Sequence, residues 1–150
     1  MTTFKKGDQA PNFSGKDQDG KLHTLADYKG KKLVVFFYPK ANTPGCTAEA
    51  CDLRDNYSRF VDNNYALLGV SADNAKAQGK FKNKFDFPFP LLADEDKSVI
   101  EAFGVWGPKK FMGRDYIGIH RTTFIIDEKG IIEEVILDVK TKNHASQILD

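Results

Sequence analysis

The chain has 150 residues, of which 41% are hydrophobic and 29% charged, and its 22 Lys and Arg against 21 Asp and Glu leave a formal net charge of +1. A chain of this length buries about two-thirds of its unfolded surface, so we expect one domain over residues 1–150. The near-neutral charge gives no electrostatic basis for binding nucleic acid or an anionic membrane, and no apolar run reaches the roughly 20 residues that span a bilayer.

The opening segment, MTTFKKGDQAPNF, lacks the apolar stretch and the small-residue cleavage site of a secretory signal. We therefore expect a cytoplasmic location. In a reducing compartment a lone pair of cysteines is more typical of a catalytic, redox or metal site than of a permanent cross-link. Cys46 and Cys51 are the only cysteines of the chain, and they are the first candidates for function.

The first third of the chain predicts a hairpin, a buried strand and a helix. Short strands at Asn12–Ser14 and Leu22–Thr24 flank the turn signal DQDG at 17–20, which favours a β-hairpin. Leu33–Tyr38, LVVFFY, is a continuous apolar run of the kind that forms a central strand buried on both faces. From Cys46 to about Val61, apolar residues recur at three- and four-residue steps, which predicts one helix.

The rest of the chain continues this alternation. A buried strand, a helix, a short strand and a short helix are predicted in turn at Ala66–Ser71, Asn74–Phe85, Pro90–Ala93 and Asp96–Phe103. TTFIID and IIEEVIL, on either side of Glu128–Gly130, predict an antiparallel hairpin, and a last helix starts near Asn143. The aromatic residues Trp106, Phe111 and Tyr116 are interpreted as core or loop packing.

Strands that alternate with helices, followed by a closing hairpin and a helix, predict an α/β fold. Periodicity alone supports only a three-layer arrangement. The order of the elements fits a thioredoxin-like fold, with a central mixed β-sheet flanked by helices and an N-terminal β-hairpin extension. No repeat, low-complexity tract or linker divides the chain.

The TPG turn places Cys46 at the start of its helix. Thr43 is a favourable N-cap and Pro44 suits the first helical position, so Cys46 falls at the third. Backbone N–H groups and the positive end of the helix dipole favour an anion there. Because the thiolate is the reactive form of a cysteine, this position makes Cys46 a candidate nucleophile.

Cys51 follows Cys46 by five residues. In an ideal helix this spacing puts the two Cα atoms about 8.6 Å apart, beyond the roughly 7 Å that a disulfide allows. Two interpretations stay open: Cys46 is a thiol at a capping position and Cys51 a small buried hydrophobe, or the helix unwinds when the pair oxidises. A zinc site has less support, because two cysteines supply half of a tetrahedral set and His23, His120 and His144 show no paired spacing.

The segment FFYPKANTPGCTAEACDLRD resembles the active-site segment of the atypical two-cysteine peroxiredoxins known as the bacterioferritin comigratory protein, or peroxiredoxin Q, family. GVWGPKKFMGRDYIGIHRTTFIID and the opening GDQAPNF resemble the same family, so the resemblance covers nearly the whole chain. Its most specific part is P-x-x-x-T-x-x-C, formed by Pro39, Thr43 and Cys46, joined to Arg121 in a later R-[ST]-T-F strand.

The resemblance implies a role for each of these residues. Cys46 corresponds to the peroxidatic cysteine, whose thiolate attacks the peroxide O–O bond and becomes a sulfenic acid, and Cys51 to the resolving cysteine. Thr43 corresponds to the hydroxyl that hydrogen-bonds the peroxide, and Pro39 to the ring that shields the thiolate from water. Arg121 corresponds to the arginine that stabilises the thiolate and the developing charge.

Glu49 lies one turn after Cys46, and we expect it to orient Arg121 through an ion pair. The motif residues also have purely structural interpretations. Thr43 could serve only as an N-cap and Pro39 only as a strand terminator. Arg121 could be a solvated charge on an edge strand.

The resemblance implies a thiol peroxidase that reduces hydrogen peroxide and organic hydroperoxides, without cofactor or metal, in antioxidant defence and cell redox homeostasis. Condensation of the sulfenic acid with Cys51 would give an intramolecular Cys46–Cys51 disulfide, which thioredoxin would reduce. We expect a monomer with no nucleic-acid or membrane partner. One rival is a protein disulfide oxidoreductase, which would ordinarily show C-x-x-C spacing. Another is a redox-sensing interaction protein whose helix melts on oxidation.

Overall fold

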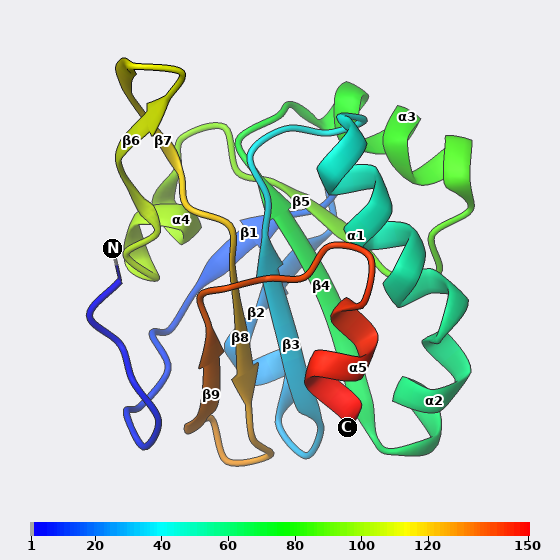
Figure 1. Cartoon of the computed structure of the whole chain (residues 1–150). Coiled ribbons are helices and arrows are strands. Elements are labelled where there is room, and N and C mark those ends of the chain that lie inside the picture. The colour runs from blue at the N-terminus through cyan, green and yellow to red at the C-terminus, as the bar shows by residue number, and fades with distance from the viewer. Residues whose placement is uncertain (1) are drawn as a thin grey trace.

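The computed structural model describes residues 2–150 and is built around a five-stranded mixed sheet (Figure 1). The strand order is β5-β4-β3-β8-β9. In the middle, β3 (Lys32–Phe37) runs parallel to β4 (Tyr65–Ser71) and antiparallel to β8 (Thr122–Ile126). At the two edges, β5 (Leu91–Ala93) is parallel to β4 and β9 (Ile132–Ile136) is antiparallel to β8. The predicted mixed sheet is confirmed.

The central strand β3 is buried on both faces, as its apolar run predicts. Leu33, Val35 and Phe37 pack into the core on one face of the sheet, while Val34 and Phe36 pack into the core on the other. This division follows from the alternation of side chains along a strand. Two hydrophobic cores therefore sandwich the sheet, and the chain leaves β3 directly into the segment that carries the cysteines.

Helices lie on both faces of the sheet. The face of Val34 and Phe36 is packed by residues of α1 (Pro44–Asp55), α2 (Tyr57–Asp62), α3 (Ala75–Phe85) and α5 (His144–Leu149). The opposite face is packed by residues of α4 (Ser98–Ala102), the 3-10 helix η1 (Leu25–Tyr28) and the N-terminal segment. Among residues 2–150, none of the helices has the length and apolar character that crossing a bilayer requires.

Most predicted elements are found with ends shifted by one or two residues. β4, α3, β5, α4, α5 and the β8–β9 hairpin all occur where they were expected. The N-terminal hairpin is also present, with β1 (Ser14–Lys16) antiparallel to β2 (Leu22–Thr24). Its first strand starts two residues later than predicted. In the turn, the Asp17 carboxylate accepts the backbone N–H groups of Asp19 and Lys21, which fixes where the strand ends.

The single helix predicted over 46–61 is wrong, because the structure divides it into α1 and α2 at Asn56. The backbone of Asn56 has φ −109° and ψ 15°, outside the helical range. Its side-chain amide donates to the Asp52 carbonyl at 2.9 Å. An asparagine that bonds back to the preceding turn competes with the helical hydrogen bonds, which explains the break.

One hairpin was not predicted at all. β6 (Trp106–Phe111) and β7 (Arg114–Ile119) form a separate two-stranded antiparallel sheet that projects from the body of the molecule (Figure 1). Trp106 packs against the core as expected, but Phe111 and Tyr116 are exposed, so their interpretation as packing residues is wrong. Because neither face of the outer hairpin is buried, its sequence shows no period-two alternation.

Candidate active site

Cys46 lies in the first turn of α1, at the third helical position, as predicted. Thr43 occupies the N-cap with extended backbone, and Pro44 is the first helical residue. The first intrahelical bond runs from the Thr47 N–H to the Thr43 carbonyl at 2.8 Å, so the N–H groups of Gly45 and Cys46 have no partner further back in the helix. Cys46 is only 2% exposed. A nearly dry thiol is thus held at the positive end of a helix.

Thr43 holds the predicted N-cap position, but its hydroxyl does not cap the helix. The hydroxyl instead donates to the Lys40 carbonyl at 2.8 Å. The turn of residues 40–43 therefore fixes the direction of the Thr43 side chain. Since the single O–H is used in this bond, the lone pairs of the hydroxyl oxygen stay available to accept a hydrogen bond.

Pro39 follows the last residues of the central strand and is half-buried. Tyr38, just before it, is fully buried and donates its phenol O–H to Gln78 Oε1 at 2.7 Å. The Tyr38 backbone N–H still bonds to the Val70 carbonyl at 3.1 Å. Pro39, which has no N–H, therefore stands where the backbone pairing of β3 ends and the active-site loop begins.

Arg121 joins the thiol to an acid. Its Nη2 donates to Cys46 Sγ at 3.4 Å and its Nη1 donates to Glu49 Oε1 at 2.7 Å. Cys46 and Glu49 are three residues apart on one face of α1, so one planar guanidinium reaches both. A Cβ atom on Gly45 would lie 3.2 Å from Arg121 Nη2, so glycine there leaves room for this approach. The interpretation of Arg121 as a solvated edge charge is wrong.

The charges around Arg121 and Glu49 shift both pKa values. Burial lowers the pKa of Arg121, but the negative charges of Glu49 and Cys46 raise it above its usual value. Glu49 is fully buried, and this burial raises its pKa to about 7 although Arg121 acts in the opposite direction. Glu49 Oε2 makes no hydrogen bond within residues 2–150. The acid paired with the guanidinium therefore has a pKa raised to about 7.

His144, the first residue of α5, belongs to the same network, although no sequence pattern marks it as a site residue. It is fully buried, and its Nε2 lies 2.7 Å from Thr123 Oγ1. Gln147 Oε1 lies 2.8 Å from His144 Nδ1 and also accepts the Lys140 N–H, while Gln147 Nε2 donates to the Asp138 carbonyl. These bonds make His144 Nδ1 the donor nitrogen. Burial lowers the pKa of His144.

Cys51 lies in α1 with Cys46, and both thiols are free. Cys51 is partly exposed. Burial raises its pKa, Arg54 lowers it and Asp55 raises it. The chain thus pairs a buried thiol beside a guanidinium with a more accessible one. Within residues 2–150, no group of three or more His, Cys, Asp or Glu side chains is arranged to hold a metal ion.

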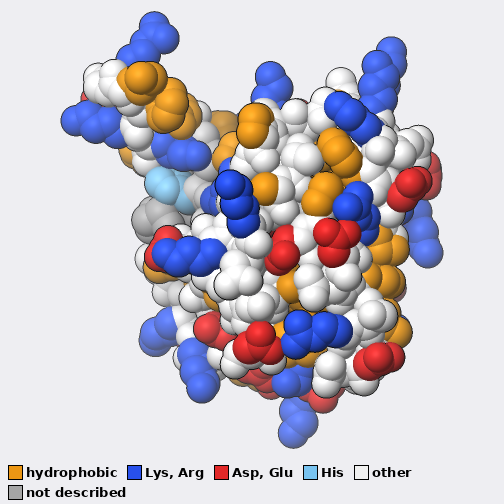
Figure 2. Space-filling model, turned by 45° about the vertical axis from the view of Figure 1, so that its right-hand side comes forward, with side chains coloured by type: hydrophobic (Ala, Val, Ile, Leu, Met, Phe, Trp, Pro, Cys, Tyr) orange, Lys and Arg blue, Asp and Glu red, His pale blue; other side chains and the backbone are white. Residues whose placement is uncertain are grey.

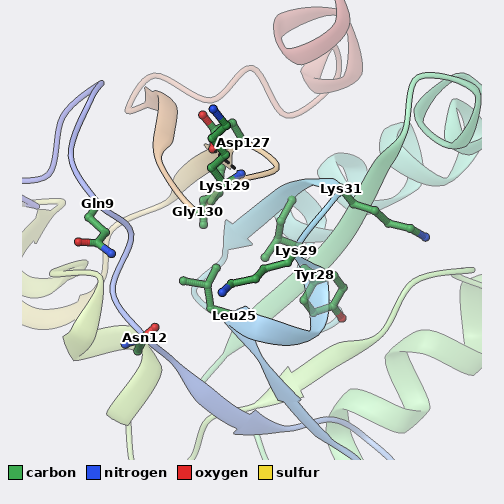
Figure 3. A pocket seen from close by; sticks show the side chains of 11 residues that line it. Gln9, Asn12, Leu25, Tyr28, Lys29, Lys31, Asp127, Lys129 and Gly130 are labelled. Atoms are coloured by element: carbon green, nitrogen blue, oxygen red, sulfur yellow. Dashed lines mark hydrogen bonds between the residues drawn. The ribbon is translucent and has the colours of Figure 1, made fainter.

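A separate pocket of about 280 Å³ lies at the other end of β3 and β8, next to Leu33 and Ile126 (Figure 3). Lysines 29, 31 and 129 border it, and Figure 3 shows Lys31 pointing away from its centre. None of its lining residues belongs to the Cys46 site. Chemistry at Cys46 therefore does not use this pocket.

The fold and the thiol site together define a known class of protein. Residues 6–135 match the model of the AhpC/TSA family. The match spans most of the chain and includes Cys46, Glu49 and Arg121.

Individual relatives narrow this class. The chain is 49% identical over 150 residues to Peroxiredoxin Bcp of Escherichia coli strain K12, covering 100% of this chain and 96% of the relative. It is 44% identical over 147 residues to Peroxiredoxin Bcp of Bacillus subtilis strain 168, covering 98% and 94% of the two chains. A crystal structure of a peroxiredoxin Q mutant from Xylella fastidiosa superposes with a TM-score of 0.92 at 34% identity, covering 99% and 95%. The chain therefore belongs to the AhpC/TSA family and, within it, to the Bcp or peroxiredoxin Q peroxiredoxins. It is a peroxidase with a thioredoxin-like fold.

Proposed function

We propose that this peroxidase reduces hydrogen peroxide and organic hydroperoxides with Cys46 as the peroxidatic thiol, Cys51 as the resolving thiol and thioredoxin as the reductant. The observation that carries the proposal is the 3.4 Å contact between Arg121 Nη2 and Cys46 Sγ at a helix N-terminus. A cation and free N–H groups beside a sulfur stabilise its thiolate. The surrounding apolar core strengthens these interactions by excluding water.

In the first step, the Cys46 thiolate attacks one peroxide oxygen and the O–O bond breaks. Two electrons pass from sulfur to the peroxide, giving a sulfenic acid on Cys46 and an alcohol or water once the leaving oxygen takes a proton. Arg121 stabilises the charge that moves from sulfur to the leaving oxygen. The Thr43 oxygen accepts the hydrogen bond of the peroxide O–H, because its own proton is held by Lys40. Pro39 limits water at the thiolate.

In the second step, the sulfenic acid condenses with Cys51. The S–S bond forms, the S–O bond breaks and water leaves, with the Cys51 proton joining the departing hydroxyl. Both cysteines lie in α1, where five-residue spacing holds the Cα atoms about 8.6 Å apart in ideal geometry. Because a disulfide needs less than about 7 Å, α1 must unwind locally for this step.

In the third step, a dithiol protein restores both cysteines. Two electrons and two protons pass from its thiols to the Cys46–Cys51 disulfide, and the dithiol itself becomes a disulfide. We take thioredoxin as this reductant. We also propose that the chain acts as a single-domain monomer in the cytoplasm, with its near-neutral net charge giving no attraction to nucleic acid.

A turnover assay tests this function. Purified protein with thioredoxin, its reductase and reductant should consume hydrogen peroxide and tert-butyl hydroperoxide over many cycles, and Cys46→Ser should consume neither. A single stoichiometric turnover would instead indicate a redox sensor. Reduction of protein disulfides without peroxide would indicate an oxidoreductase.

A further inference from the structure

The projecting β6–β7 hairpin has two chemically different faces. In an antiparallel pair, residues directly opposite each other point to the same face of the sheet. The register pairs Lys109 with Tyr116 and Phe111 with Arg114, and on the other side Pro108 with Ile117 and Lys110 with Asp115. We call the first set (Lys109, Phe111, Arg114 and Tyr116) the front face. We call the second set (Pro108, Lys110, Asp115 and Ile117) the back face.

The hairpin concentrates the large apolar side chains that face water. Within residues 2–150, four of the seven exposed large hydrophobic residues lie on it: Phe111 at 64%, Met112 at 86%, Tyr116 at 45% and Ile117 at 63% exposure. Figure 2 shows hydrophobic and basic side chains together on this arm. A two-stranded hairpin has little stability of its own, so its exposed apolar residues contribute little to folding. Grouped apolar exposure of this kind marks an interaction surface.

The charges separate between the two faces. The front face carries Lys109 and Arg114 and no acid, while Asp115 lies on the back opposite Lys110. Within residues 2–150 no salt bridge engages Arg114. Lys109 Nζ lies 5.8 Å from the centre of the Tyr116 ring. The front face is thus aromatic and cationic, and it complements an apolar surface bordered by carboxylates.

The front face also lies on the side of the hairpin that leads to the thiol. Lys109 Nζ donates to the Ile119 carbonyl at 2.7 Å, two residues before Arg121. Burial and the charge of Arg121 lower the pKa of Lys109, and the charge of Cys46 acts in the opposite direction, so Lys109 lies within electrostatic reach of both groups. In Figure 1 the hairpin stands at the end of the molecule where α1 begins. The front face, which includes Lys109, therefore borders the region around Arg121 and Cys46.

We propose that the front face, together with Met112 at the hairpin tip, docks the protein dithiol that reduces the Cys46–Cys51 disulfide, an inference that rests on the proposed function. Hydrogen peroxide needs no docking surface, whereas a protein reductant must hold its thiolate in line with a disulfide sulfur. Attack forms a mixed disulfide, and the second thiol of the reductant then releases both cysteines as thiols. The aromatic and cationic front face requires a partner surface that is apolar with acidic groups at its border.

Front and back variants provide matched tests on one hairpin. Phe111→Ser and Ile117→Ser remove side chains of nearly equal exposure, 64% and 63%, from opposite faces. Arg114→Glu and Lys110→Glu make the same charge change on opposite faces. At saturating peroxide, the two front variants should lower kcat/KM for thioredoxin about tenfold, mainly through KM, while the back variants stay within about twofold. All four should be recycled normally by dithiothreitol, which needs no docking surface.

Several outcomes would overturn the docking proposal. Equal effects of front and back variants with thioredoxin would remove the role of the front face. Equal losses with dithiothreitol would mean that the hairpin supports the site itself. Front variants that abolish binding to anionic lipid vesicles, or self-association, while leaving the KM for thioredoxin unchanged would assign the face to a membrane or to a second copy. If the wild-type protein is recycled by dithiothreitol but not by thioredoxin, thioredoxin is not the reductant. That result would contradict the docking proposal as well.

Discussion

Glu49 and His144 are both fully buried and face each other, with 3.6 Å between Glu49 Oε2 and His144 Nε2. Because His144 Nδ1 donates to Gln147, Nε2 of the neutral ring can only accept, and it accepts from Thr123. Glu49 Oε2 therefore receives no hydrogen bond, and Arg121 alone bonds to the carboxylate within residues 2–150. Two titratable side chains are thus buried next to the Arg121–Cys46 contact.

The first prediction concerns stability and pH. The pKa of Glu49 is raised from 4.5 to about 7, so between these values the folded state keeps a proton that the unfolded state has lost. Stability from this group therefore falls as pH rises through that window and is constant above it. Glu49→Gln removes this slope, so its free energy of unfolding relative to wild type should rise between pH 5 and 7.5, by about 3 kcal/mol at most.

Urea unfolding at several pH values measures this difference. His144 works in the opposite direction, because its lowered pKa makes stability fall as pH drops below about 6.5. Both proteins contain His144. Subtracting the free energy of unfolding of wild type from that of Glu49→Gln at each pH therefore cancels the contribution of His144 that does not depend on Glu49. A difference that does not change with pH would mean that Glu49 stays ionised throughout.

The second prediction concerns the guanidinium. Arg121→Ala should lower the second-order rate of reaction with hydrogen peroxide by about 10² to 10³, because one preorganised donor to the developing charge is lost. Stopped-flow fluorescence or competition with a reporter peroxidase measures the rate. Arg59→Ala, which removes an exposed ion pair with Asp150, is the matched control and should react normally. If Arg121→Ala reacts with hydrogen peroxide at a rate within about threefold of wild type, Arg121 does not stabilise the developing charge.

The third prediction separates the two thiols. Cys51→Ser should keep the first turnover with peroxide, since Cys46 and Arg121 are untouched. Recycling by thioredoxin should fail and sulfinic acid should accumulate on Cys46, because no second thiol traps the sulfenic acid. Mass spectrometry after one and after many equivalents of peroxide gives both readings. Normal recycling of Cys51→Ser would rule out the two-thiol mechanism.

The fourth prediction concerns the helix. Disulfide formation should unwind the first turns of α1, so oxidised protein should show less helix by far-UV circular dichroism and faster amide exchange over residues 43–53. Asp52 Oδ2 accepts the Ala145 N–H at 2.7 Å, which ties α1 to the start of α5. Exchange at Ala145 should therefore also increase. An oxidised form with unchanged protection in α1 would contradict this mechanism.

Local patterns in the sequence predicted most of the sheet. The apolar run of β3 and the hairpin of β8 and β9 follow from strand periodicity and turn signals. Asn56 was missed because its effect on the helix depends on a side-chain bond to Asp52 rather than on hydrophobic spacing. The β6–β7 hairpin has no such local signal, because its outer part buries neither face.

Some residues of the candidate site follow from sequence patterns, and one appears only in the folded structure. Cys46 and Glu49 share one helix, so their spacing alone placed them on one face. Arg121 was found through its motif, and the structure brings it to both. His144 reaches Glu49 only through the packing of α5 against α1, and no local pattern encodes that contact.

The break at Asn56 sets a boundary for the structural change that the proposed disulfide would cause. α1 has 12 residues, a length at which an isolated helix is only marginally stable in water. Beyond the break, α2 is anchored separately, since Phe60 is fully buried and packs edge-on against Tyr65. Cooperative melting that begins at Cys46 can therefore stop at residue 56. On the proposed mechanism, a reaction between two sulfur atoms becomes an order–disorder transition of α1 and of its contact with the start of α5, while the rest of the fold keeps its structure.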